Sequence, residues 1–315
     1  MFKTIQAGAF AVALFAAGPA LAERFVSAYA PQAGERAEIT IDKCRVSVRN
    51  GERSESCARS VLLEEVLSPS AQGGGRMRYT LQSVQPLGAS AAAAAGALTP
   101  DVERALRNFS LLVVVDEAGF PTRVENFDEM MRHVRAFFPA DDAGAQRALD
   151  AFFERMDAAG AAQLFTRDWA GVSLFQAIEA EVGEPVTGTV TMPFPVDPSL
   201  TIDATATLLV QSIDHASRRA RITYTQVVDE ASARPVVQVF VERMMAAASA
   251  PPADMAEQLA AMRISRTDRW DAVVDVPSGR VVEMRSEADA AVAVGDDTRR
   301  TTDTITLTRR MLPPQ

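Results

Sequence analysis

The two cysteines, Cys44 and Cys57, are the residues whose spacing most clearly suggests chemistry. They flank Asn50-Gly51, the strongest two-residue signal for a β-hairpin. In a type I′ hairpin turning at these residues, the cysteines face each other on a non-hydrogen-bonded pair, where Cα atoms lie about 4.5 Å apart. A four-residue loop would keep them opposite, but on a hydrogen-bonded pair. A redox pair is the alternative, although redox motifs place C-x-x-C at a helix start. We therefore predict a structural disulfide.

Residues for other active-site chemistry are few. Only two histidines occur, His133 on a predicted helix one turn from Glu129 and His215 in a predicted hairpin turn. An ion pair or a solvated position is the expected role for each. The sequence has no G-x-S-x-G elbow, P-loop, dinucleotide fingerprint or EF-hand loop, and a zinc site would need three or four ligands. We predict a non-catalytic protein with no catalytic residues, no metal site and no cofactor.

Two carboxylate pairs keep one enzymatic alternative open. A glycosidase needs two carboxylates that the fold brings together, and Asp141-Asp142 and Asp296-Asp297 are the closest pairs in the sequence. The first fits a helix N-terminus, where negative charge is favourable, and the second falls in a predicted loop. Glycosidases usually carry many aromatic residues for sugar stacking, whereas this chain has two Trp and three Tyr.

The first 22 residues are typical of a secretory signal peptide. Lys3 precedes an apolar run from Ala7 to Gly18, and Ala20-Leu21-Ala22 places small residues before a cleavage site after Ala22. A membrane anchor is the alternative, but the run is shorter than the ~20 residues that a span needs. The mature chain has net charge −10, because removal of Lys3 leaves 31 basic residues against 41 acidic ones. We expect a periplasmic or secreted protein that binds no nucleic acid and has no membrane span after cleavage.

The order of elements predicts an α+β fold. Strands come first, helices follow, and strands return, which favours curved antiparallel sheet with a central helical segment, about 126–181, packed on one face. The domain prediction is a signal peptide at 1–22 and a single domain at 23–315, with two sheet-rich halves at 23–181 and 182–315 as the alternative. The expected strands are Ala37–Arg49, Glu52–Val66, Arg76–Val84, Phe109–Asp116, Phe120–Val124, Val186–Met192, Thr201–Ile213, Arg219–Val228, Ile264–Val276, Arg280–Met284 and Thr302–Thr308, with another apolar stretch at Val236–Met244.

The expected helices begin at recognisable caps. Asn126 and Glu129 form a capping box for a helix that runs to Phe138, before Pro139. Asp142 starts a second helix that ends near Gly160, and Asp254–Met262 is a third. Pro193, Pro195 and Pro198 indicate a loop.

Two stretches of the chain have a similar order of elements. Tyr79-Thr80 and Tyr224-Thr225 each lie in a strand that is followed by a loop, one or two prolines and a short helix. Two strands then follow in each stretch, joined by a turn at Gly119 in the first and at Gly279 in the second. An internal duplication is one interpretation, and convergence on common hairpin chemistry is the other.

The overall plan resembles that of small exported bacterial proteins of unknown function. The shared features are a signal peptide, a sheet-rich chain, central helices and D-x-x-G-x-x-x-x-V at Asp116, Gly119 and Val124. Over most of the mature chain, the order of elements is also similar to the basket folds of periplasmic lipoprotein-carrier proteins, in which a curved antiparallel sheet wraps around helices. The resemblance implies a cavity for an apolar ligand and transfers no functional residue.

Two functional hypotheses follow. The first is a carrier whose sheet holds a lipid or other apolar ligand beneath the helices, because methionine-rich surfaces suit variable apolar ligands. The candidate lining residues, whose alternative role is simply the core, are Met130, Met131, Phe137, Phe138, Phe152, Phe153 and Met156. The second hypothesis is a structural or protein-interaction factor of the cell envelope, with an envelope protein as partner. A continuous apolar cavity would favour the first, and an exposed edge strand or apolar patch would favour the second.

Overall fold

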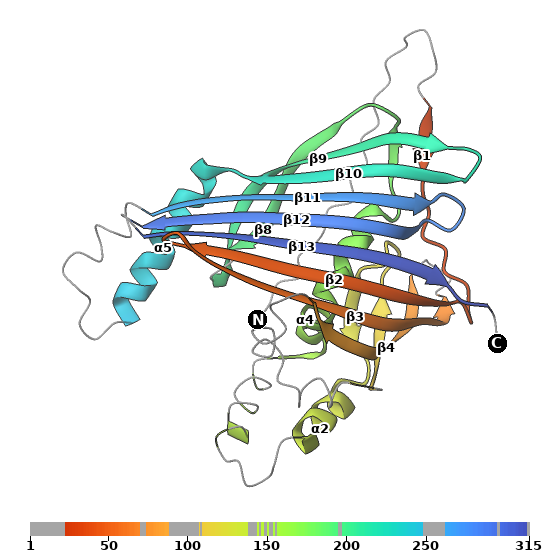
Figure 1. Ribbon diagram of the computed structural model, residues 1–315, viewed down its shortest axis with the longest axis horizontal. Helices are drawn as coiled ribbons and strands as arrows, with labels where there is room; N and C mark the ends of the chain where they lie inside the picture. Colours follow the sequence, from red (N-terminus) through yellow and green to blue (C-terminus); the bar gives the residue numbers. More distant parts are fainter. Residues whose placement is uncertain are drawn as a thin grey trace.

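A computed structural model describes residues 23–69, 74–87, 109–137, 156–194, 197–247, 262–294 and 297–313, with single positions at 107, 144, 146, 147, 150 and 154. Its main element is one eleven-stranded antiparallel sheet in the order β6-β5-β4-β3-β2-β13-β12-β11-β10-β9-β8. The sheet is curved and does not close, and Figure 1 shows its long strands side by side with α4 behind them. The strands are β2 (Arg36–Arg49), β3 (Glu52–Pro69), β4 (Gly75–Pro86), β5 (Ser110–Val115), β6 (Pro121–Val124), β8 (Val186–Phe194), β9 (Asp197–Asp214), β10 (Arg219–Val228), β11 (Arg263–Asp275), β12 (Arg280–Val294) and β13 (Asp297–Met311).

The pairing of β2 with β13 places the first and the last strand of this sheet, in sequence order, side by side in its middle. It runs from Arg299 opposite Arg49 to Met311 opposite Ala37. All other neighbours in the sheet are consecutive strands of the described chain. One non-local pairing therefore joins two meanders, β2 to β6 and β8 to β13, into a single sheet.

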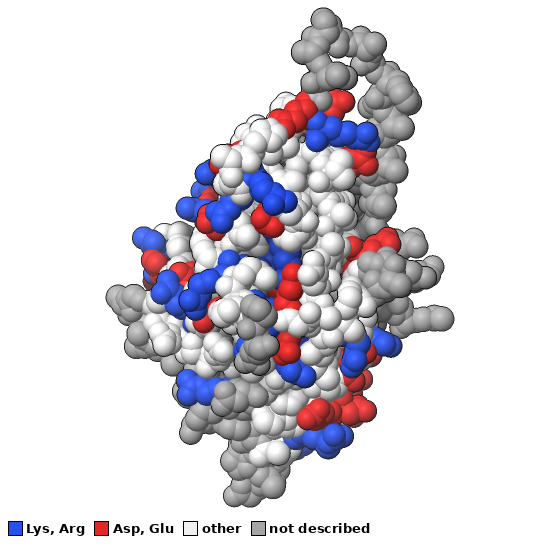
Figure 2. Space-filling view, turned by 90° about the vertical axis from the view of Figure 1, so that its right-hand side faces the viewer, with Lys and Arg blue, Asp and Glu red and all other residues white. Residues whose placement is uncertain are grey.

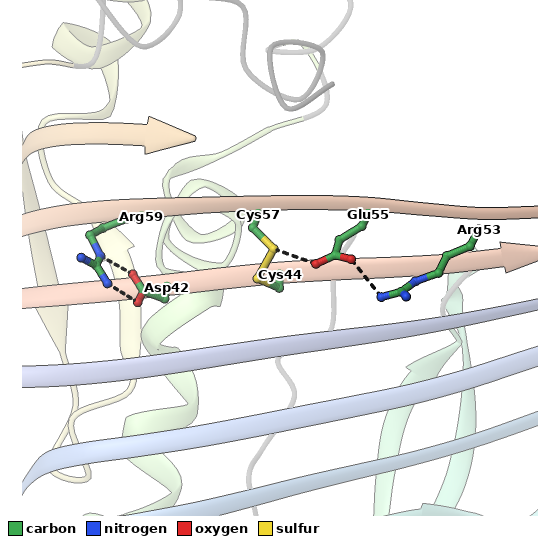
Figure 3. Close-up of a disulfide and its surroundings, with 6 residues drawn as sticks. All are labelled: Asp42, Cys44, Arg53, Glu55, Cys57 and Arg59. Atoms are coloured by element: carbon green, nitrogen blue, oxygen red, sulfur yellow. Dashed lines mark hydrogen bonds and ion pairs between the residues drawn. A yellow bond between two sulfur atoms is a disulfide. The ribbon is translucent and has the colours of Figure 1, made fainter. Parts of the chain in front are cut away.

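The predicted N-terminal hairpin and its disulfide are confirmed. Asn50 and Gly51 have φ values of 50° and 87°, the left-handed conformations that a type I′ turn requires. Cys44 lies opposite Cys57 in the register, their Cα atoms are 4.1 Å apart, and the two residues form a disulfide. Figure 3 shows the bridge in line with the ion pair between Asp42 and Arg59 on the same hairpin.

Several strands are longer than the sequence predicted. The predicted return strand at 280–284 continues to Val294, and the predicted last strand at 302–308 is β13. Cross-strand ion pairs stabilise the polar ends of these strands. Arg300 Nε and Nη2, for example, donate to the Asp289 carboxylate at 2.8 and 2.5 Å, so the strands need no apolar alternation there. Of the three prolines predicted to lie in a loop, Pro193 belongs to β8 and Pro198 to β9, whereas Pro195 lies outside the described residues. β8 lies at the edge of the sheet, where proline is tolerated.

The helical segments differ in detail from the predictions. They are α2 (Phe127–Phe137), α4 (Ala158–Ala170), the 3-10 helix η3 (Gly171–Phe175) and α5 (Glu230–Ala247), and a two-stranded sheet pairs β1 (Arg24–Val26) with β7 (Glu179–Glu181). The stretch Val236–Met244 belongs to α5 and is not a strand. No helix in the described ranges is both long enough and apolar enough to cross a membrane.

Two predicted helix boundaries are corrected by their hydrogen bonds. The side chain of Asn126 does not cap α2, because its Oδ1 accepts the Leu112 N–H at 2.8 Å and its Nδ2 donates to the Ser110 carbonyl at 2.8 Å. Gly160 does not end a helix: its N–H donates to Asp157 Oδ1 at 2.7 Å, which makes Asp157 the N-cap of α4. The predicted helix at 254–262 and most of 138–155 lie outside the described residues.

The buried side chains lie on one face of the sheet, here called the inner face, and form two clusters. The main cluster joins the β2 to β5 strands and the β10 to β13 strands with α2, α4 and η3, and it includes Ile39, Leu307, Met130, Ala161 and Phe175. The far cluster lies where α5 packs against β9 and β11, and it contains Ile202, Ala204, Val228, Ala233 and Val237. Figure 1 places α5 at the end of the sheet away from the β11–β12 turn. The proposed duplication is not confirmed: β5 and β6 span 6 and 4 residues, whereas β11 and β12 span 13 and 15.

Candidate functional site

The predicted ligand-binding residues that the structure describes pack into the main cluster. Met130 on α2 is fully buried, and Met131 and Met156 pack against the same cluster. Phe138, Phe152 and Phe153 lie outside the described residues, and the side chain of Phe137 is also outside them. The described members are therefore neighbours in one apolar cluster. Their predicted contact with a ligand stays a prediction.

A polar line across the inner face separates the two apolar clusters. On β11, Ile264 packs against the far cluster and Trp270 packs against the main cluster, while Asp268 lies between them. The strand registers continue this line from strand to strand across the sheet. We call it the dividing row, and its members are Gly188, Ala206, Gln226, Asp268, Ala288, Asp303 and Arg45.

Asp268 is the most buried charged residue of the dividing row. It is 1% exposed, and its carboxylate accepts hydrogen bonds from Arg266 Nε at 3.0 and 2.8 Å. Burial raises the pKa of Asp268, the Asp303 carboxylate raises it further, and the neighbouring Arg266 guanidinium acts in the opposite direction. The Arg266 side chain is 29% exposed. The pair therefore joins an interior carboxylate to a cation that extends toward solvent.

A second ion pair, between Arg45 and Asp303, lies along the same row. Arg45 Nε and Nη2 donate to the Asp303 carboxylate at 2.6 and 2.8 Å. Only Ala288 separates Asp303 from Asp268 in the register. Neighbouring strands lie about 4.8 Å apart, so the two carboxylate-bearing positions are about 10 Å apart across a small side chain. The row therefore carries two carboxylates with the small Ala288 between them, and each carboxylate has an arginine partner.

Two aromatic residues border the row on the side of the main cluster. Tyr224 and Trp270 lie opposite each other on β10 and β11, with ring centroids 5.4 Å apart. Burial raises the pKa of Tyr224, and the Asp268 carboxylate raises it further. A Cβ at Gly171 would lie 3.1 Å from Trp270 Nε1, so the glycine lets η3 approach the indole closely.

The row and its neighbours offer charged, polar and aromatic groups for contact with a ligand. They comprise two ion pairs, the Gln226 amide and two aromatic residues. Among the described residues, no group of three or more His, Cys, Asp or Glu side chains could hold a metal ion. The two histidines lie elsewhere: His133 stacks on Phe109 with ring centroids 4.7 Å apart, and His215 Nε2 lies 2.8 Å from Glu23 Oε1.

A second buried polar group, here called the end cluster, joins side chains of β3, β13 and β12 across the intervening β2. Arg309 Nη2 donates to Glu64 Oε2 at 3.0 Å, and Arg309 Nη1 donates to the Val281 carbonyl at 2.6 Å. Arg280 lies 3.6 Å from Glu64 and 2.9 Å from Glu35. Glu64, Arg280 and Arg309 have side chains only 3, 3 and 5% exposed.

Two tyrosines complete the end cluster. Burial raises the pKa of Tyr29 to about 12, with Glu64 as the next cause. Burial also raises the pKa of Tyr79 well above its usual value. Two arginines therefore face two glutamates, and the neutral tyrosine hydroxyls add no charge. This balance indicates a structural cross-link between the strands.

The outer surface adds a cleft with both charged and apolar lining residues. A cleft of about 520 Å³ lies at the ends of β3, β4 and β5, lined by Arg76, Asp116, Glu117, Arg123 and Glu125 together with Ser68, Pro69, Gly75, Val114 and Val115. Arg76 is paired with Glu125 at 2.6 Å. Figure 2 shows acidic and basic side chains interspersed over the end of the molecule. This face has no single-sign patch of the kind that nucleic acid requires.

The sequence pattern contained a signal for the dividing row that the sequence interpretation missed. Ile264, Arg266, Asp268 and Trp270 are spaced by two in a predicted strand, so they share one face of the sheet. An alternating strand does not by itself show which of its faces is covered. Only the assembled sheet shows that Asp268 lies on the covered face while Arg269 is exposed.

Comparison with known proteins gives weak structural likenesses only. No family model and no curated protein matches the chain. OpdL of Pseudomonas aeruginosa is 7% identical with a TM-score of 0.22, and the match covers 89% of this chain and 99% of that chain. OpdQ of Pseudomonas aeruginosa is 8% identical with a TM-score of 0.24, covering 89% and 98%. A "putative outer membrane lipoprotein-sorting protein domain" from Vibrio parahaemolyticus is 7% identical with a TM-score of 0.16, covering 88% and 86%. The last likeness partly echoes the expected carrier resemblance and carries no functional argument.

Proposed function

We propose that this chain is an exported, non-catalytic binding protein of the bacterial envelope that holds a single-chain amphipathic lipid on the inner face of its sheet. The observation that carries the proposal is the dividing row between two apolar clusters. A domain usually has one contiguous core, and here a buried carboxylate interrupts the apolar residues of one continuous sheet face. An amphipathic ligand has the same alternation of apolar and polar parts.

The charges of the row favour a zwitterionic head group. The cation of Arg266 suits a phosphate, which guanidinium groups bind through paired hydrogen bonds. The neighbouring carboxylate of Asp268 suits an ammonium group, since it is buried and Arg266 is its one ion-pair partner among the described residues. The acyl chain would lie against the apolar residues of the main cluster, to which Trp270 belongs. The methionines predicted from the sequence are part of the same cluster, and methionine side chains adapt to apolar ligands.

Export is part of the same proposal. The disulfide between Cys44 and Cys57 supports an oxidising compartment. The first 22 residues have the pattern of a cleaved leader. Detection of the mature N-terminus at Glu23 in the periplasmic fraction is the expected result, and a chain retained in the cytoplasm would contradict it.

Lysophosphatidylethanolamine is the probe that tests the ligand. The chain has two tryptophans, so a Trp169→Phe variant leaves Trp270 as the only fluorescent indole. Titration with the lipid below its micelle-forming concentration should change the Trp270 emission. Arg266→Gln should weaken binding about tenfold, equivalent to about 1.4 kcal/mol, while Arg269→Gln on the opposite face is the matched control. No binding at ~100 µM lipid, which corresponds to less than about 5–6 kcal/mol, together with a lipid-free extract of the purified protein, would reject the proposal.

A structural or protein-interaction role in the envelope is the second candidate. One observation favours it: β8 is a long edge strand of an open sheet. Exposed edges are templates for pairing with another chain. Cross-linking in cells that recovers an envelope protein through β8 would support this role, and recovery of no envelope partner would count against it.

A further inference from the structure

The two edges of the main sheet are built differently. The β6 edge has four residues, begins with Pro121 and carries the charge of Arg123. It is also covered, because α4 packs along it. Short length, proline, charge and a covering helix are the usual means by which proteins prevent an edge from pairing with another chain.

The β8 edge has few of these protections. It spans nine residues without a charged side chain, and its only proline within the strand, Pro193, lies next to its end. One side of the strand is paired with β9 from Val186 opposite Leu208 to Phe194 opposite Asp197. On the other side, the described residues supply no neighbouring strand. Within the described part of the chain, that side of β8 is therefore an edge with which a further strand could pair.

The side chains of β8 alternate without interruption. Val186, Gly188, Val190 and Met192 are half-buried on the inner face, whereas Thr187, Thr189 and Thr191 are exposed on the outer face. The adjacent pair of strands already uses threonine contacts, since the hydroxyls of Thr187 and Thr207 lie 3.1 Å apart. A partner strand with the same alternation would extend this pattern.

We propose that β8 of a second copy of this chain pairs antiparallel with β8, so that two sheets join across a two-fold axis at Val190. A two-fold interface requires a patch that complements itself. In this register Val190 faces Val190, Thr189 faces Thr191 of the other copy, and the small Gly188 faces the larger Met192. Threonine pairs and β-branched pairs are favourable cross-strand neighbours, and no two like charges face each other within the nine residues.

A second copy is the occupant that this sequence fits best. A partner with charged residues would gain no opposite charge on β8 itself, so the strand offers pairing by shape and backbone alone. The register centred on Val190 is also the self-pairing that engages every residue of the strand. Gly188 belongs both to β8 and to the dividing row, but the inference does not rest on the lipid proposal, because strand pairing uses the backbone groups of the edge and not the ion pairs of Asp268 and Asp303.

The oligomeric state of the mature protein tests the inference. Sedimentation velocity between about 1 and 100 µM should show a monomer–dimer equilibrium, with association near 6–8 kcal/mol in that range. Thr189→Lys places two lysines near the axis and should raise the dissociation constant about tenfold or more. Thr205→Lys is the matched control, because Thr205 is exposed on the same face of the neighbouring strand, directly opposite Thr189. A monomer at every concentration, or a dimer that Thr189→Lys leaves unchanged, would overturn the inference.

A cysteine placed at the axis tests the register. Val190→Cys should form a disulfide between two copies under mild oxidation, because that position faces itself across the axis. Met192→Cys should not, because it faces Gly188 of the other copy. Intermolecular bridging at Met192→Cys but not at Val190→Cys would reject the register, and capture of a different protein at Val190→Cys in place of a second copy would reject the proposed occupant.

Discussion

The end cluster and the dividing row both bury charge in this sheet, but in different ways. In the end cluster, Glu64 and Arg309 are both almost fully covered, at 3 and 5% side-chain exposure. At the dividing row, the side chain of Asp268 is 2% exposed, whereas the side chain of its partner Arg266, which lies beside the row on β11, is 29% exposed. The first arrangement pairs glutamates with arginines inside the protein and cross-links strands, although Nε and Nη2 of Arg280 and Nε of Arg309 have no hydrogen-bond partner among the described residues. The second leaves one member of the pair within reach of a ligand.

The difference teaches that burial alone does not identify a binding site. The cost of removing two charges from water is offset only when both find partners with good geometry. Glu64 has two arginines within 3.6 Å, so the charge of its carboxylate is compensated within the end cluster. Asp268 has one arginine partner, and its pKa is raised by burial, which indicates that its charge is less well compensated.

The largest expected effect comes from breaking the end cluster. Glu64→Gln leaves Arg309 buried without its carboxylate and leaves Arg280 with Glu35 alone, and loss of one partner of a buried pair costs about 3–5 kcal/mol. Urea unfolding followed by circular dichroism gives the measurement. Glu65→Gln is the matched control on the other face of the same strand, where Glu65 pairs with the half-exposed Arg78. Equal loss in the two variants would show that the end cluster has no special role.

The next largest loss of stability is expected from removal of the disulfide. The bridge joins β2 and β3 and belongs neither to the end cluster nor to the dividing row, so its loss gives a reference value for the other variants. Replacing Cys44 and Cys57 with Ser should lower the stability by about 2–3 kcal/mol through loop entropy. Lipid binding should be unchanged, because the bridge is not part of the dividing row. Differential scanning calorimetry and the Trp270 titration measure the two properties. Loss of binding in the double variant would show that the hairpin and the row are coupled.

A smaller effect on stability is expected from Asp268→Asn in the dividing row. The folded protein binds the Asp268 proton more tightly than the unfolded chain, because burial raises the pKa. Stability that depends on this group is therefore highest below the ordinary aspartate pKa of about 3.8 and decreases as the pH rises through the folded pKa. Urea titrations at several pH values should show that the variant gains on the wild type as the pH rises. A pH-independent difference would contradict this assignment.

The smallest effect is expected from the exposed ion pairs of the outer face. They contrast with the buried charges of the end cluster and of the dividing row. The Arg59 guanidinium lowers the pKa of Asp42, and hydrogen bonds from Arg269 and Arg300 lower those of Asp271 and Asp289. These groups contribute stability above the ordinary aspartate pKa that is lost as the pH falls through the folded values. Asp42→Asn should slightly reduce the acid sensitivity measured by urea unfolding at pH 5 and 3. A steeper acid dependence in the variant would contradict this sign.

Local features were predictable because nearby residues determine them. The turn at Asn50-Gly51 set the register of the hairpin, and therefore the contact of Cys44 with Cys57, since both lie within seven residues of the turn. The hairpin at 214–217 followed from the same logic. Proline and polar residues misled the interpretation of β8, β12 and β13, because a wide sheet carries such residues on an edge or in cross-strand pairs.

The sequence by itself determined the antiparallel character of the chain, its hairpins and its disulfide, because each depends on contacts over a few residues. Only the tertiary structure decided that β13 lies beside β2, which brings Arg309 to Glu64 across 245 positions of sequence. The same pairing placed Arg45 opposite Asp303 in the dividing row and left β8 as an edge among the described strands. The physical reason is that strand alternation specifies two faces and two edges equally well, and only packing selects which face is covered and which edge stays open.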